Sequence, residues 1–166
     1  MPNQEVFTSP TLGKLPLNRV IKEITRYLHE EPQYKYRLVI GTDSQDRRIN
    51  GKKLTNFVTA IVVHRVGKGG RYFWKNGQVE HIRSLRQKMY TETLRSIEVA
   101  QEVVPQLNSK LNGKENLELE IHIDVGRSGD TRDMIKEVVG IVIGNGYTAK
   151  TKPDSFGASS VADKHA

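Results

Sequence analysis

Apolar residues recur along the chain in two patterns, one with the spacing of helices and one with the spacing of strands. Apolar positions every three or four residues predict helices over residues 17–30, 84–111 and 131–143. Short or alternating apolar runs predict strands over residues 36–43, 54–66, 71–79, 117–125 and 147–152. A last short helix is expected to start near Ser159 or Ser160. This order predicts an α/β fold with a five-stranded mixed sheet, antiparallel at its hairpin edge, parallel elsewhere and covered by helices on both faces.

Two segments depart from this regular pattern. Residues 1–16 contain three prolines and Gly13 with little periodicity, which predicts a flexible N-terminal arm or loop. Pro105 lies inside the longest helical segment, where a proline removes a backbone hydrogen bond, so we expect a kink there or two consecutive helices. The remaining residues, 17–166, have the length of a single domain.

Composition excludes several classes of protein. The chain has no Cys, which excludes a disulfide framework, a Cys-ligated metal site and thiol catalysis. The longest apolar runs, residues 57–63 and 138–143, are far shorter than the roughly 20 residues that cross a bilayer, and the N-terminus has no signal-peptide pattern. We therefore expect a cytoplasmic protein with no membrane partner.

Positive charge is concentrated in the middle of the chain. The protein has 26 Lys and Arg against 19 Asp and Glu, a net charge of +7. Residues 34–95 alone hold 14 basic and 4 acidic side chains, and the rest of the chain is mildly acidic. A basic surface of this kind attracts polyanions, and nucleic acid is the commonest of them. The alternative is a solvated surface that serves only solubility.

Several residues are candidate contacts to nucleic acid. Aromatic residues alternate with basic ones in the third predicted strand, a pattern that can stack exposed bases beside a backbone-binding groove. Alternation also predicts that one face of that strand belongs to the core. Arg127 follows a glycine in a strand-to-helix loop, where a phosphate contact competes with a simple tight turn capped by Asp130. The candidate contacts are Arg71, Trp74, Lys75, Arg127 and Lys152.

Four acidic residues occupy positions that need an explanation. Asp43 and Asp124 each end a predicted strand, and strands that pair in parallel bring such ends to the same edge of a sheet. Glu92 lies three residues after Met89, on the helix face that otherwise buries apolar groups. Asp163 is placed on the last predicted helix. Asp43 followed by Ser44 is also typical of a turn, which is the structural alternative for that residue.

A cluster of carboxylates favours a cation site. Neighbouring carboxylates raise one another's pKa, so such clusters persist by sharing protons or by binding cations. Four hard oxygen ligands without Cys favour Mg²⁺ or Mn²⁺, and a pair of such ions is suited to phosphodiester hydrolysis. We therefore predict that Asp43, Glu92, Asp124 and Asp163 hold two Mg²⁺ or Mn²⁺ ions and form the catalytic centre.

Several motifs resemble a known group of proteins. Gly-Thr-Asp-Ser-Gln at 41–45, His-Ile-Asp-Val-Gly at 122–126 and Val-Ala-Asp-Lys-His at 161–165, in this element order, resemble the ribonuclease H-like superfamily and, within it, the bacterial YkuK-like family of unknown function. The resemblance implies a ribonuclease H-like domain over residues 17–166, with the 17–30 helix as an N-terminal addition. It also implies a four-carboxylate, two-metal nuclease-type centre that hydrolyses RNA, DNA or a hybrid.

The resemblance has limits that leave other functions open. Proofreading-type exonucleases of this superfamily carry Asp-x-Glu on the first strand, whereas this chain has Gln45 two residues after Asp43, which disfavours that branch. One alternative is a nucleic-acid-binding module that keeps the ribonuclease H-like fold without catalysis. Another is a phosphotransfer protein, but such relatives generally use two domains around a nucleotide, and 166 residues supply one.

Overall fold

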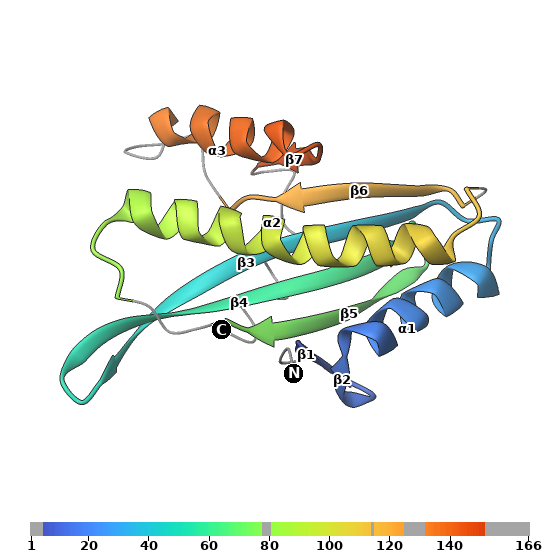
Figure 1. Cartoon of the computed structure of the whole chain (residues 1–166), viewed down its shortest axis with the longest axis horizontal. Coiled ribbons are helices and arrows are strands. Elements are labelled where there is room, and N and C mark those ends of the chain that lie inside the picture. Colours follow the sequence, from blue (N-terminus) through green and yellow to red (C-terminus); the bar gives the residue numbers. More distant parts are fainter. Residues whose placement is uncertain (1–4, 78–80, 114, 125–131, 152–166) are drawn as a thin grey trace.

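The computed structural model describes residues 5–77, 81–113, 115–124 and 132–151. They form one mixed sheet with three helices (Figure 1). Along the chain the elements are β1 (Val6–Ser9), β2 (Gly13–Pro16), α1 (Leu17–Glu30), β3 (Tyr36–Ile49), β4 (Lys52–Arg65), β5 (Gly69–Asn76), α2 (Leu85–Lys110), β6 (Leu117–His122), α3 (Arg132–Gly144) and β7 (Thr148–Lys150).

The sheet has the strand order β2-β1-β5-β4-β3-β6-β7. Strands β3, β6 and β7 pair in parallel, and the β5-β4-β3 part is antiparallel. The prediction of an α/β fold with a mixed sheet is therefore confirmed. The five predicted strands form the continuous β5-β4-β3-β6-β7 part, but the sheet has seven strands, so the predicted count is wrong.

The two additional strands come from residues 6–16, which the sequence pattern placed in a loop. β1 and β2 pair with each other, and β1 meets β5 only at Thr8, opposite Trp74. Each strand is four residues long and buries one large side chain, Phe7 in β1 and Leu15 in β2. The alternation of apolar and polar residues is therefore too short to predict a strand. Gly13 lies at the turn with φ 74°, a conformation that glycine adopts readily.

β3 is much longer than predicted. It continues past Asp43, where a polar turn was expected, as far as Ile49, and it pairs with β4 without interruption from Tyr36 to Ile49. The turn instead lies at Asn50 and Gly51, with φ values of 52° and 76°. Two positive φ values in a two-residue turn match the right-handed twist of a hairpin, which is why Asn-Gly is favoured there.

All three described helices pack against one face of the sheet. A single core gathers residues from α1, α2, α3 and the facing sides of the strands, among them Ile24, Leu38, Ile61, Val103 and Val138. On the opposite face the described residues form a smaller cluster of Val58 and Ala60 with Trp74 against them. The predicted helices on both faces are therefore not seen among the described helices, and the helix expected near Ser159 lies outside the described residues.

α2 is one helix of 26 residues that continues through Pro105, so of the two predicted alternatives, a kink or two consecutive helices, the second is wrong. Pro105 and Gln101, the residue whose carbonyl loses its helical partner, are both exposed, so that carbonyl can be solvated. Val103 and Leu107 on the opposite side are buried and hold the helix against the core. No helix in the described part of the chain has the length and apolar character needed to cross a membrane.

Candidate active site

α2 and β3 are fixed in register by side-chain hydrogen bonds at one end of the sheet. Thr42 on β3 is within hydrogen-bond distance of Ser96 on α2, at 2.7 Å, and of Thr59 on β4, at 2.9 Å. One turn earlier on α2, Glu92 accepts a 2.5 Å hydrogen bond from the Ser44 hydroxyl. Thr42, Ser44 and Ser96 are buried, so these contacts place the Glu92 carboxyl between the helix and the sheet.

Asp43 and Asp124 each lie two residues beyond the last registered pair of two neighbouring parallel strands. Gly41 is the last β3 residue registered with β6, opposite His122, and two further steps on each strand lead to Asp43 and Asp124. The chain stays extended beyond β6, because the Ile123 N–H donates to the Lys150 carbonyl at 2.8 Å. Asp43 therefore lies inside the long strand β3, two residues beyond the last residue that pairs with β6. Its interpretation as a turn residue is wrong.

The pKa of Glu92 is raised by burial and by the charges of its neighbours. Burial raises this pKa most strongly, and the negative charges of Asp43 and Asp124 raise it further. The hydrogen bond from Ser44 and the charge of Lys88 oppose these effects, but the pKa still reaches about 8. At neutral pH the Glu92 carboxyl therefore holds a proton that a bound cation could replace.

The donor set fits a hard divalent cation in its chemistry. Asp43, Glu92 and Asp124 offer only oxygen atoms, which Mg²⁺ and Mn²⁺ prefer. Across the residues that the structure describes, no three His, Cys, Asp or Glu side chains are gathered closely enough to hold an ion by themselves. Asp163, the fourth predicted ligand, lies outside the described residues.

The three predicted nucleic-acid contacts that the structure describes do not lie on one face of the sheet. Lys75 makes an ion pair with Glu5 on the helix-covered side of the sheet, and Trp74 packs against Val58 and Ala60 on the opposite side. Arg127 and Lys152 lie outside the described residues.

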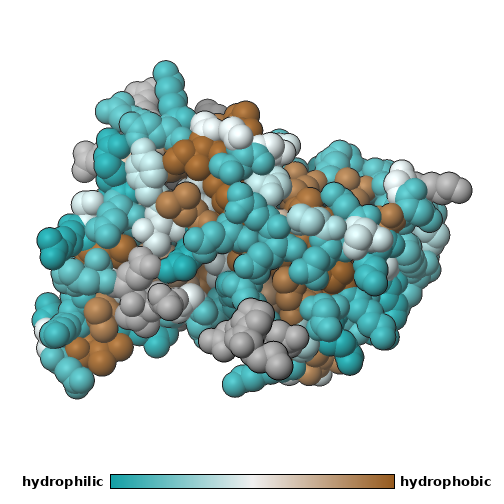
Figure 2. Space-filling view, in the orientation of Figure 1, coloured by the Kyte–Doolittle hydropathy of each residue, from teal (hydrophilic) through white to brown (hydrophobic). Residues whose placement is uncertain are grey.

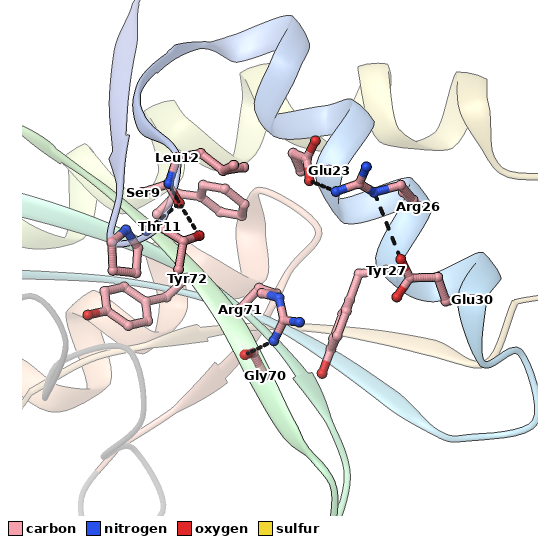
Figure 3. A pocket seen from close by; sticks show the side chains of 12 residues that line it. Ser9, Thr11, Leu12, Glu23, Arg26, Tyr27, Glu30, Gly70, Arg71 and Tyr72 are labelled. Carbon is pink, nitrogen blue, oxygen red and sulfur yellow. Dashed lines mark hydrogen bonds and ion pairs between the residues drawn. The ribbon is translucent and has the colours of Figure 1, made fainter.

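Arg71 lies far from the carboxylates, beside a cavity of about 470 Å³ between the β1–β2 turn, α1 and the start of β5 (Figure 3). Its guanidinium is 4.7 Å from the ring centre of Tyr27, and Arg26 across the cavity pairs with Glu23 at 2.7 Å. The pairing of β3, β4 and β5 places Arg71 level with Leu38, five residues before Asp43. The cavity and the carboxylates are therefore at different ends of the strands.

The sequence interpretation missed the exposed basic residues of the β3–β4 turn. Arg48 and Lys52 lie on the part of the hairpin that extends past the other strands, close along the chain to Asp43. Asn50-Gly51 was the available signal, because this dipeptide between two β-rich segments predicts a tight hairpin. With that turn assigned, the basic residues are predicted on a two-stranded projection instead of a loop.

Comparison with known proteins gives the group to which this arrangement belongs. The sequence model of the family described as Ribonuclease H-like matches residues 19–166. The chain belongs to the ribonuclease H-like family. It is 34% identical to the Uncharacterized protein YkuK of Bacillus subtilis (strain 168), over 99% of this chain and 98% of that protein. No solved structure matches the chain significantly. The predicted resemblance to YkuK-like, ribonuclease H-like proteins is confirmed.

Membership of the ribonuclease H-like family agrees with the central part of the sheet. The match begins in α1 and spans β3 to β7, so the β1–β2 hairpin precedes it. Asp43, Glu92 and Asp124 all lie within the matched residues. The family supports a nuclease-like fold.

Proposed function

We propose that the protein is a divalent-metal-dependent nuclease that hydrolyses phosphodiester bonds of nucleic acid. Asp43, Glu92, Asp124 and Asp163 would hold Mg²⁺ or Mn²⁺, and the ions would supply charge stabilisation to the attacking and leaving oxygens. The observation that carries the proposal is geometric: Asp43 and Asp124 each lie two residues beyond the last registered pair of the parallel strands β3 and β6, and Ser44 holds the Glu92 carboxyl beside β3. The pKa of Glu92, raised to about 8 by burial and by the charges of Asp43 and Asp124, supports it. Carboxyls whose negative charges act on one another, as those of Asp43 and Asp124 act on Glu92, are costly to keep without a cation.

The side chains of this protein have separate tasks in the proposal. Ser44 and the helix register hold Glu92 toward the strand ends, so the carboxyl is positioned before any ligand binds. Lys88, one turn before Glu92 on α2, contributes a positive charge near the cluster and is suited to a phosphate oxygen. Asp43 and Asp124 approach from the sheet, and their separate strands fix their spacing.

The first test is calorimetric titration of Mn²⁺ into the wild type and into the Asp43→Asn, Asp124→Asn double variant. We expect saturable binding in the wild type and its loss in the double variant, with the thermal unfolding temperature maintained or raised, because like charges are removed. A matched control, Glu30→Gln with Glu98→Gln, removes two exposed carboxylates elsewhere and should bind as the wild type does. Equal binding by all three proteins would overturn the metal centre.

A second candidate is a nucleic-acid-binding module with the ribonuclease H-like fold and no turnover. It is favoured by the basic residues of the β3–β4 hairpin, which are exposed whether or not the carboxylates bind a cation. A panel of labelled RNA, DNA and hybrid oligonucleotides with Mn²⁺ separates the two functions. Cleavage that Asp124→Asn abolishes supports the nuclease, whereas binding without cleavage at saturating Mn²⁺ supports the module.

A further inference from the structure

The β3–β4 hairpin projects beyond the rest of the sheet as a two-stranded arm. β6 stops pairing with β3 at Gly41 and β5 stops pairing with β4 at Val58, so residues 45–49 and 52–56 pair only with each other in the sheet (Figure 1). Five paired residues at ~3.3 Å per residue make this arm roughly 16 Å long. Residues 45–53 are exposed on both of its faces.

The arm is basic. It carries Arg47, Arg48, Lys52 and Lys53 and one acidic residue, Asp46. Asp46 accepts a 2.8 Å hydrogen bond from Thr55 and pairs with Lys53 at 3.4 Å, and the hydrogen bond lowers its pKa. Among the ion pairs of the described residues, none involves Arg48 or Lys52. Figure 2 shows the arm at lower left, with hydrophilic side chains around a small apolar patch.

A cavity lined largely by basic residues lies between the arm and the start of α2, the helix that carries Glu92. Lys53, Arg83 and Lys88 line this space of about 230 Å³ together with Asp46. The charge of Lys88 acts on both Asp46 and Glu92, lowering the pKa of each. Lys88 therefore lies between the arm and Glu92, where it is suited to a phosphate of a nucleic acid that contacts the arm.

We propose that this arm, residues 45–56, enters the major groove of duplex DNA and positions one strand at the carboxylates. The inference rests on the proposed function in taking nucleic acid as the partner, and it adds the form of that nucleic acid. The major groove of B-form DNA, about 12 Å wide and 8.5 Å deep, admits a two-stranded β-ribbon. The corresponding groove of A-form RNA is too deep and narrow for side chains to read.

The arm is poorly suited to a single strand. Proteins that bind single strands stack bases on aromatic side chains, and residues 45–56 contain no aromatic residue. They contain instead four cations for phosphates, and the amide side chains of Gln45, Asn50 and Asn56, which can pair with base edges in a groove. The composition of the arm therefore favours the duplex over the single strand.

The test is fluorescence anisotropy with a 24-base-pair DNA duplex, its single strand and an RNA duplex of the same sequence, in EDTA so that no hydrolysis occurs. We expect the wild type to bind the DNA duplex at least ~10-fold more tightly than the other two. The Arg48→Gln, Lys52→Gln variant should lose ~10-fold or more on the DNA duplex, and its salt dependence, the slope of log K against log salt, should fall by about 2.

A matched control removes the same charge from another surface. Arg19→Gln with Lys22→Gln alters two exposed residues of α1 and should bind the DNA duplex within about twofold of the wild type. Equal losses in the arm variant and this control would overturn the inference, as would wild-type binding that is no tighter to the duplex than to the single strand. Failure of the nuclease proposal has a different readout, because Mn²⁺-dependent cleavage is measured separately from binding in EDTA.

Discussion

Helix α2 carries two inward carboxyls with raised pKa values, and their surroundings differ. Burial and the hydrogen bond to Glu5 raise the pKa of Glu102 to about 7, whereas burial and two further carboxylates raise that of Glu92 to about 8. Near Glu102, Lys75 donates a hydrogen bond to Glu5. Burial raises the pKa of Glu5, but the hydrogen bonds from Glu102 and Lys75 outweigh this effect, so the pKa of Glu5 is lowered. At the Glu92 end, the nearby cation, Lys88, acts only through space.

The difference separates a structural cluster from a candidate cation site. Glu5 accepts hydrogen bonds from Lys75 on β5 and from the protonated carboxyl of Glu102 on α2. These contacts join the N-terminal segment to both elements without any ligand. At Glu92, the charges of Asp43 and Asp124 raise the pKa, the charge of Lys88 lowers it, and the pKa still reaches about 8. A raised pKa alone therefore does not identify a cation site on α2. The signs of the charges around the carboxyl distinguish the two clusters.

The largest expected difference between the Glu92 cluster and the Glu102 cluster is in the rate of hydrolysis. If only the Glu92 cluster is catalytic, Asp124→Asn should reduce Mn²⁺-dependent cleavage by at least ~100-fold, because a charge-stabilising group is lost. Glu102→Gln, at the other cluster, should change cleavage by less than about twofold. The measurement is the initial rate on the best oligonucleotide of the panel. Equal losses in both variants would remove the distinction between the clusters.

The next effect is on the pH dependence of stability. Because folding raises the pKa of Glu92 from 4.5 to about 8, the folded protein binds the proton more tightly than the unfolded chain in this range. The free energy of unfolding should therefore fall as pH rises from 4.5 to about 8, by at most ~1.4 kcal/mol per pH unit from this residue. Urea unfolding of Glu92→Gln, compared with the wild type across this range, measures that part.

Asp43→Asn provides the finer comparison in the same experiment. Removing this negative charge lowers the pKa of Glu92, so the decline in stability should end at a lower pH than in the wild type. Parallel curves for the wild type and Glu92→Gln would contradict a proton held by Glu92 in the folded state.

A smaller effect tests the structural cluster. The Lys75 side chain is 18% exposed, and replacing it with Met leaves Glu5 and Glu102 without their cation. Lys75→Met should cost about 2 kcal/mol at pH 8 and less at pH 5, where both carboxyls can be protonated. The double variant Glu5→Gln, Lys75→Met should recover part of this loss in a double-mutant cycle. Additive losses would show that the pair is not coupled.

The smallest effect concerns the hydrogen bond that positions Glu92. Ser44→Ala removes the bond that lowers the pKa of Glu92, so this pKa should rise further and Mn²⁺ affinity at neutral pH should fall a few-fold. The stability cost should be about 1 kcal/mol. Thr25→Val is the matched control, since it removes a side-chain hydrogen bond on α1, from the Thr25 hydroxyl to the Ile21 carbonyl at 2.8 Å, away from the Glu92 carboxyl. It should cost similar stability and leave Mn²⁺ affinity unchanged.

The sequence predicted the long periodic elements well and the short or exceptional ones poorly. The α1 segment matched its prediction at 17–30, and α3 and the β4–β5 hairpin differed only by a few residues at their ends. The β1–β2 hairpin was missed because four-residue strands have too few positions to show alternation. The extension of β3 was missed because its exposed arm has polar residues on both faces, so no buried face imposes a hydrophobic period.

For the candidate site, Glu92 was predictable because an acidic residue among apolar positions on one helix face is exceptional. The sequence placed Asp43 at the end of a strand, which is wrong because β3 continues to Ile49. Asp43 does lie near the end of the parallel pairing, two residues beyond the last β3 residue that pairs with β6. The candidate nucleic-acid contacts show the opposite. Lys75 and Trp74 are adjacent in sequence, but strand alternation places them on opposite faces of the sheet.

The sequence by itself determined the α/β class, the order of the central elements and the acidic residues of interest, because periodicity and residue type are local properties of the chain. Only the tertiary structure decided which charges meet. The parallel pairing of β3 with β6 places Asp43 and Asp124 each two residues beyond its last registered pair, although they are far apart in the chain, and the packing of α2 on β3 adds Glu92. Electrostatic energy depends on distance and burial, and both are set by the fold and not by the spacing of residues along the chain.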